Sequence, residues 1–413
     1  MEPFLSRCRA ELQVNEGRFH VVLGNEACDL DSMVSALAYA YFLSKTVHGG
    51  ALALPLLNVR QLDFVLRSDN VFLLRKAGMS PDQLLFRDQI DLQALQSAGR
   101  LQLTLVDHNV LPSSDNNLEE AVVEVIDHHQ LERKPSASCP VTVEMVGSCT
   151  TLVTERILQM APEILDQQLA QLLYATILVD CINMAPAAGK ATPKDIHYAA
   201  VLEERFPKLP PHDVLFSDLQ GAKFDVSGLN TEQMLRKDMK TVSGSLNVAV
   251  SVIYITLEEF LQKADLEVEL SQFCMRFSFD LVLLMSIRFN AKNEPCRHLA
   301  VFSHSATCRA EMSQYLEQVR NPALNLCPIS SPHPQITAYL QGNTHASRKK
   351  LLPIVRDFLQ DCDGHLGEEE EESQVPPTPM NSLVEGCPLD AGPPRISAQA
   401  LEEKFNKMAD ARK

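Results

Sequence analysis

Acidic residues follow three apolar, strand-like runs in the first half of the chain, and two histidines follow the third. Carboxylates that converge on one place repel each other and resist ionisation unless a cation neutralises them. Oxygen ligands combined with one or two imidazoles suit Mg²⁺ or Mn²⁺ better than metals that prefer thiolates. The pattern therefore predicts a divalent-metal site. The residues at these run ends are Asp29, Asp31, Asp107, Asp127, His128 and His129.

Each of these residues, taken singly, has a plainer interpretation. A lone Asp after a strand is more often a helix N-cap or a turn residue, and a lone pair of histidines is more often a surface or core feature. The metal hypothesis depends on the three clusters occurring together in one region. Cys28 lies inside the first cluster, and we interpret it as a small, partly buried neighbour of the site.

The elements that must position these residues alternate between strand and helix. In open α/β sheets, ligands bind outside the carboxyl ends of the strands, so parallel neighbours would bring the acids together at one edge. The predicted fold is therefore α/β, a mainly parallel sheet with helices on both faces. The predicted strands are Phe19–Leu23, Ala51–Leu57, Leu101–Asp107 and Ala121–Asp127, and the predicted helices are Ser32–Lys45, Ser148–Met160 and Asp166–Cys181.

Composition along the chain predicts three regions. The run FPKLPPH at Phe206–His212 indicates a boundary, which places the first domain at residues 1–208 and a smaller α/β domain at 213–360. Residues 361–413 contain five consecutive glutamates and several prolines. We expect them to form a disordered, acidic tail whose last residues could bind a partner as a short helix. In the second domain the predicted strands are Leu246–Ile255, Phe279–Phe289 and His298–Phe302, and the predicted helices are Leu257–Met275 and Leu351–Leu359.

Charge and cysteine content exclude several classes of protein. The 413 residues include 37 Lys and Arg against 53 Asp and Glu, a net charge of −16, and aromatic residues make up only 6%. Nucleic-acid binding is therefore disfavoured. The cysteines number 11 and form no CxxC pair, which argues against a zinc ribbon or a disulfide framework and predicts reduced thiols in an intracellular protein. We find no signal peptide and expect no membrane span.

Five motifs, in order, resemble those of the DHH phosphoesterase superfamily. Asn25–Ser32 (NEACDLDS) resembles the first motif, Asp107–Asn109 (DHN) the second, and Asp127–His129 (DHH) the signature. Asp180 in TILVDC resembles the fourth, and Ser347–Lys350 (SRKK) the basic motif of the second domain. The stretches VVLGNEACDLDS, VGSCTTLVTERIL, GKATPKD, AKFDVSGL, EQMLRKD and PPTPMNSLV further resemble the animal prune family within that superfamily.

The resemblance implies two bound cations, Mn²⁺ or Mg²⁺, that activate a water molecule. It assigns Asp29 to the first metal and Asp31 to the second, with Asp107 bridging both. His128 and Asp180 would complete the second site. Two further candidates, Asn25 and Asp127, are left open as ligands, and the residues expected to act in catalysis are Asp107, His128 and His129.

The resemblance also implies residues that hold the substrate. His129 would face the phosphates, and Arg348, Lys349 and Lys350 would grip them from the second domain. The alternative for that motif is a basic first turn on a surface helix. A phosphate-binding lysine of the related pyrophosphatases is replaced here by Gly221, and Lys223 is an open candidate for the same role.

One departure from the pyrophosphatase pattern affects the expected activity. Those enzymes begin the first motif with a histidine ligand, whereas this chain has Asn25. An amide oxygen is a weaker donor to Mn²⁺ than an imidazole nitrogen. We therefore expect a slower enzyme that acts on longer or different phosphoesters.

The expected function is hydrolysis of short polyphosphates, of cyclic nucleotides, or of both. The resemblance also implies a regulatory role in cell migration and proliferation, protein partners bound through the tail, nucleoside diphosphate kinase among them, and a cytoplasmic location that extends to the nucleus. Homo-oligomerisation is left open. The competing hypothesis is a regulatory scaffold with a weak or vestigial site.

Overall fold

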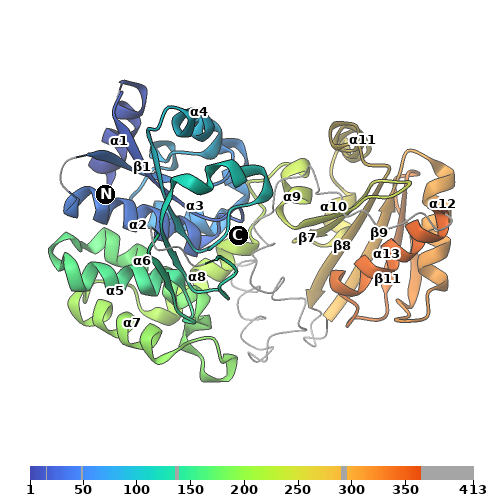
Figure 1. Cartoon of the computed structure of the whole chain (residues 1–413). Coiled ribbons are helices and arrows are strands. Elements are labelled where there is room, and N and C mark those ends of the chain that lie inside the picture. Colours follow the sequence, from blue (N-terminus) through green and yellow to red (C-terminus); the bar gives the residue numbers. More distant parts are fainter. Residues whose placement is uncertain (15, 48–49, 135–138, 290–294, 364–413) are drawn as a thin grey trace. The chain divides into compact units, whose positions relative to one another are not determined.

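The computed structural model describes residues 1–363 apart from 15, 48–49, 135–138 and 290–294. The chain divides into two compact units, one from Met1 to Phe224 and one that begins at Asp225 (Figure 1). The predicted acidic tail lies outside the described residues, except that the last helix continues to Asp363.

The first unit is built on a parallel sheet of five strands in the order β2-β1-β3-β4-β5. Side chains on both faces of the sheet are fully buried, for example Val21 and Leu103 on one face and Val22 and Thr104 on the other, as expected for strands covered on both faces. The carboxyl ends of β1, β3 and β4 therefore share one edge, which confirms the predicted sheet. The strands are β1 (Arg18–Leu23), β2 (Ala51–Leu56), β3 (Leu101–Val106), β4 (Val122–Asp127) and β5 (Val141–Val143).

Helices flank this sheet, and three of them, α2, α5 and α6, pack against one another. Helix α6 is apolar and buried from Leu169 to Leu178 over most of its surface. No helix in the described part of the chain is long and apolar enough to cross a bilayer. The helices are α1 (Glu2–Val14), α2 (Leu30–Thr46), α3 (Ser68–Lys76), α4 (Leu92–Ser97), α5 (Cys149–Met160), α6 (Gln167–Asp180), α7 (Pro193–Arg205) and α8 (His212–Phe224).

Helix α8 corrects the predicted domain boundary. The structure divides after Phe224, whereas the proline-rich run placed the end of the first domain at residue 208. The reason is that α8 packs on α3 and α6, and its Leu215 and Leu219 are buried in the core of the first unit. The prolines therefore mark a turn within the unit.

The second unit contains a mixed sheet of six strands in the order β10-β11-β9-β8-β7-β6, in which β7 and β8 are parallel. One apolar cluster, which includes Leu283 and Phe358, lies on one face, and another, which includes Leu284 and Phe273, lies on the other. The strands are β6 (Met239–Val242), β7 (Val248–Ile253), β8 (Leu281–Phe289), β9 (Pro295–Phe302), β10 (Leu326–Ile329) and β11 (Ile336–Gln341).

The predicted helix Leu257–Met275 is two helices in the structure. Asp265 lies in the left-handed region with φ 56°. The first of the two helices begins with a capping box, in which Thr256 and Glu259 each accept the backbone N–H of the other. A left-handed residue cannot continue a right-handed helix, so the chain breaks there. The helices of this unit are α9 (Thr231–Lys237), α10 (Leu257–Leu261), α11 (Leu266–Phe277), α12 (Ala306–Gln318) and α13 (Arg348–Asp363).

Candidate metal centre

The loop between β1 and α2 carries the first acidic cluster. Gly24 is required at its start because a Cβ there would overlap the hydroxyl of Ser32, which accepts the Asn25 N–H at 2.7 Å. Asp29 is the N-cap of α2 and accepts the Ser32 N–H at 3.1 Å. Cys28 has φ 50°, so the chain enters the helix through a left-handed turn.

Two side chains from the segment that starts α3 hold the backbone of this loop. The guanidinium of Arg67 is fully buried and donates to the carbonyls of Ala27 at 3.0 Å and Glu26 at 3.5 Å. Asn70 donates its amide N–H to the carbonyl of Cys28 at 2.9 Å. Three consecutive carbonyls of the loop are therefore fixed from outside the motif. The sequence analysis did not find these two residues.

Asp31 is fixed by the N-terminus of α5. Its carboxylate accepts the N–H of Cys149 at 2.6 Å and that of Thr150 at 2.7 Å, together with the Thr150 hydroxyl at 2.6 Å. The first turn of a helix presents unpaired N–H groups and a partial positive charge, which favour an anion. A predicted ligand is thus oriented by residues more than a hundred positions away in the sequence.

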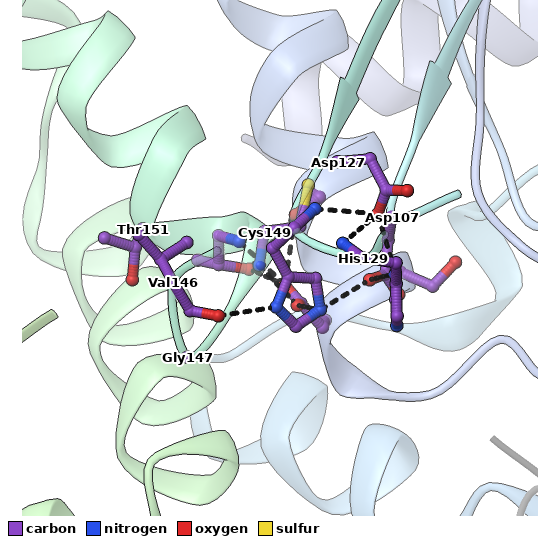
Figure 2. Close-up of polar contacts among 12 residues, drawn as sticks. Asp107, Asp127, His129, Val146, Gly147, Cys149 and Thr151 are labelled. Atoms are coloured by element: carbon purple, nitrogen blue, oxygen red, sulfur yellow. Dashed lines mark hydrogen bonds and ion pairs between the residues drawn. The ribbon is translucent and has the colours of Figure 1, made fainter. Parts of the chain in front are cut away.

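Asp107, His128 and His129 form a compact group whose potential ligand atoms lie within 4.8 Å of one another. His128 Nε2 lies 3.3 Å from Asp107 Oδ1 and 3.6 Å from Asp31 Oδ2. Figure 2 shows Asp107 and His129 side by side, with Asp127 next to them. Asp107 is the first residue after β3 and has φ 61°, a conformation that Asp tolerates better than most residues. Four residues predicted from three strand ends therefore meet.

Asp127 orients its neighbours and is not part of that compact group. It is fully buried and accepts from His129 Nδ1 at 2.7 Å, from the His128 N–H at 2.8 Å and from Asn109 Nδ2 at 2.6 Å. Burial acts to raise the pKa of Asp127, but the hydrogen bonds and charge of His129, with help from Asn109, lower it overall. Both oxygens of Asp127 accept hydrogen bonds from protein groups, so this candidate ligand orients His128 and His129.

Asn25 is also engaged by protein groups. Its oxygen accepts the Cys28 N–H at 3.1 Å, and its amide nitrogen donates to Asp107 Oδ2 at 2.8 Å and to the Asp107 carbonyl at 3.1 Å. The oxygen that we considered as a metal ligand is therefore turned to the loop backbone. In this arrangement Asn25 holds Asp107 in place.

The electrostatics of the cluster favour a cation. Burial and repulsion from Asp31 raise the pKa of Asp29, and burial together with Asp31 and Asp29 raises the pKa of both Asp107 and Asp180 well above the usual range. Burial opposes protonation of His128, but Asp107 and Asp31 raise its pKa to about 11. Among the described residues, Asp180 Oδ2 is buried without a hydrogen-bond partner, and Asp107 Oδ1 is buried 3.3 Å from His128 Nε2. Orphaned carboxylate oxygens beside mutually repelling acids are what a divalent cation satisfies.

Three thiols surround these carboxylates. Burial raises the pKa of Cys28 to about 12, and it also raises the pKa of Cys149 and Cys181. Cys149 points its sulfur at the Ile126 carbonyl, 3.3 Å away. Cys28 is a neighbour of the site, as interpreted from the sequence, but it is fully buried rather than partly buried, with an exposure of 1%.

The predicted basic residues differ in their surroundings. Arg348 is buried and forms an ion pair with Asp238 at 2.5 Å, whereas Lys349 and Lys350 are exposed on the first turn of α13. The phosphate contact predicted for Arg348 stays a prediction, and it would have to compete with this pair. Lys223 is half-buried at the end of α8, where its charge acts to lower the pKa of Asp29.

Comparisons with family models and with known proteins found clear matches. Residues 20–177 match the model of the DHH family, N-terminal domain, and residues 217–358 match that of the DHHA2 domain. Exopolyphosphatase PRUNE1 of Bos taurus is 50% identical over 99% of this chain and 97% of its own length. The chain belongs to the DHH family.

More distant relatives cover smaller shares of the chain. A putative exopolyphosphatase of Schizosaccharomyces pombe is 27% identical over 83% of this chain and 91% of that protein. The manganese-dependent inorganic pyrophosphatase of Methanocaldococcus jannaschii is 27% identical over 53% of this chain and 66% of that protein. The resemblance inferred from the motifs is therefore confirmed.

Proposed function

We propose that this DHH family chain is a metal-dependent hydrolase of phosphoanhydride bonds, with short polyphosphates as its main substrates. The observation that carries the proposal is the group of buried acids and imidazoles at one sheet edge, whose carboxyls raise one another's pKa. The names of the relatives, exopolyphosphatase and manganese-dependent pyrophosphatase, support the same reaction class. Activity on cyclic nucleotides is a further proposal.

We assign the cations to the side chains as follows. Asp29 would hold one cation, Asp31, His128 and Asp180 would hold a second, and Asp107 would contact both. Such cations supply Lewis acidity, which makes a water molecule nucleophilic at neutral pH and neutralises the phosphate oxygens. The protein contributes fixed carboxylates whose geometry the N-terminus of α5 and the side chain of Asn25 maintain.

His129 would act on the substrate directly. Its Nδ1 is bonded to Asp127 at 2.7 Å, and its Nε2 is buried without a hydrogen-bond partner among the described residues. Asp127 therefore fixes the ring and leaves Nε2 for a ligand. A ring held in this way can form a hydrogen bond through Nε2 to a phosphate oxygen.

Phosphate release by the purified chain tests the proposal. Tripolyphosphate, tetrapolyphosphate, pyrophosphate and cyclic AMP are compared with Mn²⁺, with Mg²⁺ and with chelator. We expect metal-dependent turnover that is fastest on the short polyphosphates. If the protein binds Mn²⁺ but turns over none of these substrates, the competing hypothesis of a regulatory scaffold is favoured. The tail segment that this hypothesis invokes lies outside the described residues.

Lys223 provides a prediction about substrate binding. Lys223→Met should raise KM for tripolyphosphate about tenfold, because one charge-assisted contact to phosphate is lost. Mn²⁺ affinity should stay equal or increase, since a cation near Asp29 is removed. Steady-state kinetics and Mn²⁺ titration measure the two quantities.

Lys208→Met is the matched control, because Lys208 is an exposed lysine of the same unit. It should change neither quantity. A fall in Mn²⁺ affinity with an unaltered KM for Lys223→Met would show that Lys223 supports the fold of the loop and does not meet substrate.

Asn25 provides a prediction about metal preference. Asn25→His replaces a side chain that contacts Asp107 with an imidazole, which is a better donor to Mn²⁺ than an amide oxygen. We expect tighter Mn²⁺ binding and a higher Mn²⁺ to Mg²⁺ preference in metal titrations. Unchanged affinities in a folded variant would mean that position 25 serves only to hold the loop.

A further inference from the structure

One peptide group links a distant carboxylate to His128. The carbonyl of Val146 accepts from His128 Nδ1 at 2.9 Å, and the N–H of the same peptide, on Gly147, donates to Asp195 Oδ2 at 2.8 Å. Figure 2 shows Val146 and Gly147 in the loop beside the centre, with the Val146 carbonyl directed at an imidazole. We infer that Asp195 is a positioning residue that orients and tunes His128 through this peptide.

Asp195 makes more contacts than a helix cap requires. It is fully buried in the first turn of α7, where it accepts the N–H and the hydroxyl of Thr192, both at 2.7 Å. Those bonds complete the capping box of the helix. The carboxylate additionally accepts the Gly147 N–H and the Thr151 hydroxyl, the latter at 2.6 Å. These two contacts, to residues more than forty positions away, lie outside the cap.

The Val146–Gly147 peptide is pressed closely onto this carboxylate. A Cβ at Gly147 would overlap the sulfur of Cys181 and would lie 3.0 Å from Asp195 Oδ2. Only glycine allows that approach. Glycine at position 147 therefore lets the Val146–Gly147 peptide group lie between Asp195 and His128.

The chemistry of the relay follows from the direction of its hydrogen bonds. A carboxylate that accepts the N–H of a peptide polarises it and makes its carbonyl a stronger acceptor. The carbonyl then holds the proton of His128 on Nδ1, so that Nε2 is the ring nitrogen that faces Asp107 and Asp31, 3.3 and 3.6 Å away, and the nitrogen that a cation bound by those carboxylates would meet. Partners of this kind fix the tautomer of a metal-binding histidine and raise its basicity.

The same loop also controls Asp31. The N–H groups of Cys149 and Thr150, which hold the Asp31 carboxylate, follow Gly147 by two and three positions. Anchoring the loop at Asp195 therefore secures two proposed ligands of one cation. The inference rests on the proposed metal role of His128 and adds a residue outside all the motifs of the metal site.

Asp195→Asn tests the inference in the full chain. The amide oxygen can still accept the Gly147 N–H, and its nitrogen can donate to the Thr151 hydroxyl, so shape is kept and the charge is lost. We expect Mn²⁺ affinity at one of the two sites to fall about 10–100-fold, measured by electron paramagnetic resonance of free Mn²⁺. In the Mg²⁺-loaded protein, the ¹⁵N spectrum should show a weakened hydrogen bond at the Nδ1–H of His128.

Two further variants control for loss of stability. Asp166→Asn changes the N-cap of α6, whose carboxylate accepts the Leu169 N–H at 2.8 Å and has no bond to the loop. It should leave Mn²⁺ binding unchanged. Thr151→Val removes one contact of Asp195 but spares the cap of α7, and it should weaken the same Mn²⁺ site by a few-fold.

The outcomes separate this inference from the proposed function. Wild-type protein that binds no Mn²⁺ would defeat the proposed function. Wild-type protein that binds two Mn²⁺ ions, while Asp195→Asn and Thr151→Val bind them equally well with an unaltered Nδ1–H hydrogen bond of His128, would overturn the inference alone. Equal weakening in Asp166→Asn would overturn it as well. Should Asp195→Asn fail to fold, the Thr151→Val result decides.

Discussion

Asp107→Asn should lower kcat for tripolyphosphate by about a thousandfold or more, because the proposed cations supply several kcal/mol of transition-state stabilisation. Asp107 belongs to the compact group and lies against His128 Nε2 at 3.3 Å. Asn fits the left-handed backbone at this position and keeps the side-chain shape. Phosphate release and Mn²⁺ titration measure the effect.

Asp115→Asn is the matched control for Asp107→Asn. Asp115 is another buried carboxylate of the first unit, paired with Arg87 at 2.9 Å. It should lose some stability and keep its turnover. The metal-free Asp107 variant should be at least as stable as the wild type, since a carboxyl repelled by Asp31 and Asp29 is removed. A folded Asp107→Asn protein with most of its activity would eliminate the proposed mechanism.

Arg348→Ala should reduce the free energy of unfolding of the second unit by about 3–5 kcal/mol. Its guanidinium pairs with Asp238, and the two side chains are only 4% and 0% exposed. Removing the cation leaves a buried carboxylate whose Oδ2 also accepts the Tyr254 hydroxyl at 2.7 Å. Urea unfolding of the full chain, followed by circular dichroism, measures the loss.

Two further variants show whether the lost stability comes from the broken ion pair. Lys349→Ala, at the exposed neighbour, should change stability by less than about 0.5 kcal/mol. Adding Asp238→Asn to Arg348→Ala should restore part of the lost stability, because the unpaired charge is then gone. If Arg348→Ala raises KM strongly with no loss of stability, the guanidinium serves phosphate as the sequence predicted, and the ion pair contributes little.

The sequence predicted the sheet and the meeting of its acids for a simple geometric reason. Parallel strands place their carboxyl ends at one edge, so residues that follow β1, β3 and β4 must approach each other. Asp31, Asp107 and His128 could therefore be grouped before their contacts were known. Three helices of the first unit, α2, α5 and α6, were predictable from apolar runs of helical length.

The supporting residues could not be predicted, because their roles depend on contacts between distant parts of the chain. Arg67 and Asn70 reach a loop about forty positions away, and Asp195 reaches Gly147 at a similar separation. A buried arginine or aspartate looks in sequence like an ordinary surface charge. The break at Asp265 was missed for another reason, since a single left-handed residue leaves the apolar periodicity around it intact.

The raised pKa values of the three thiols around the centre have a consequence for its chemical durability. Cys28, Cys149 and Cys181 are buried, and their protonated state is favoured. The thiolate is the form that peroxides oxidise and that soft ions such as Zn²⁺ capture. The three thiols beside the carboxylates should therefore react slowly with oxidants and with soft metal ions. An oxidant should reach an exposed cysteine such as Cys327 first, and the three buried thiols should stay reduced while the surface is modified.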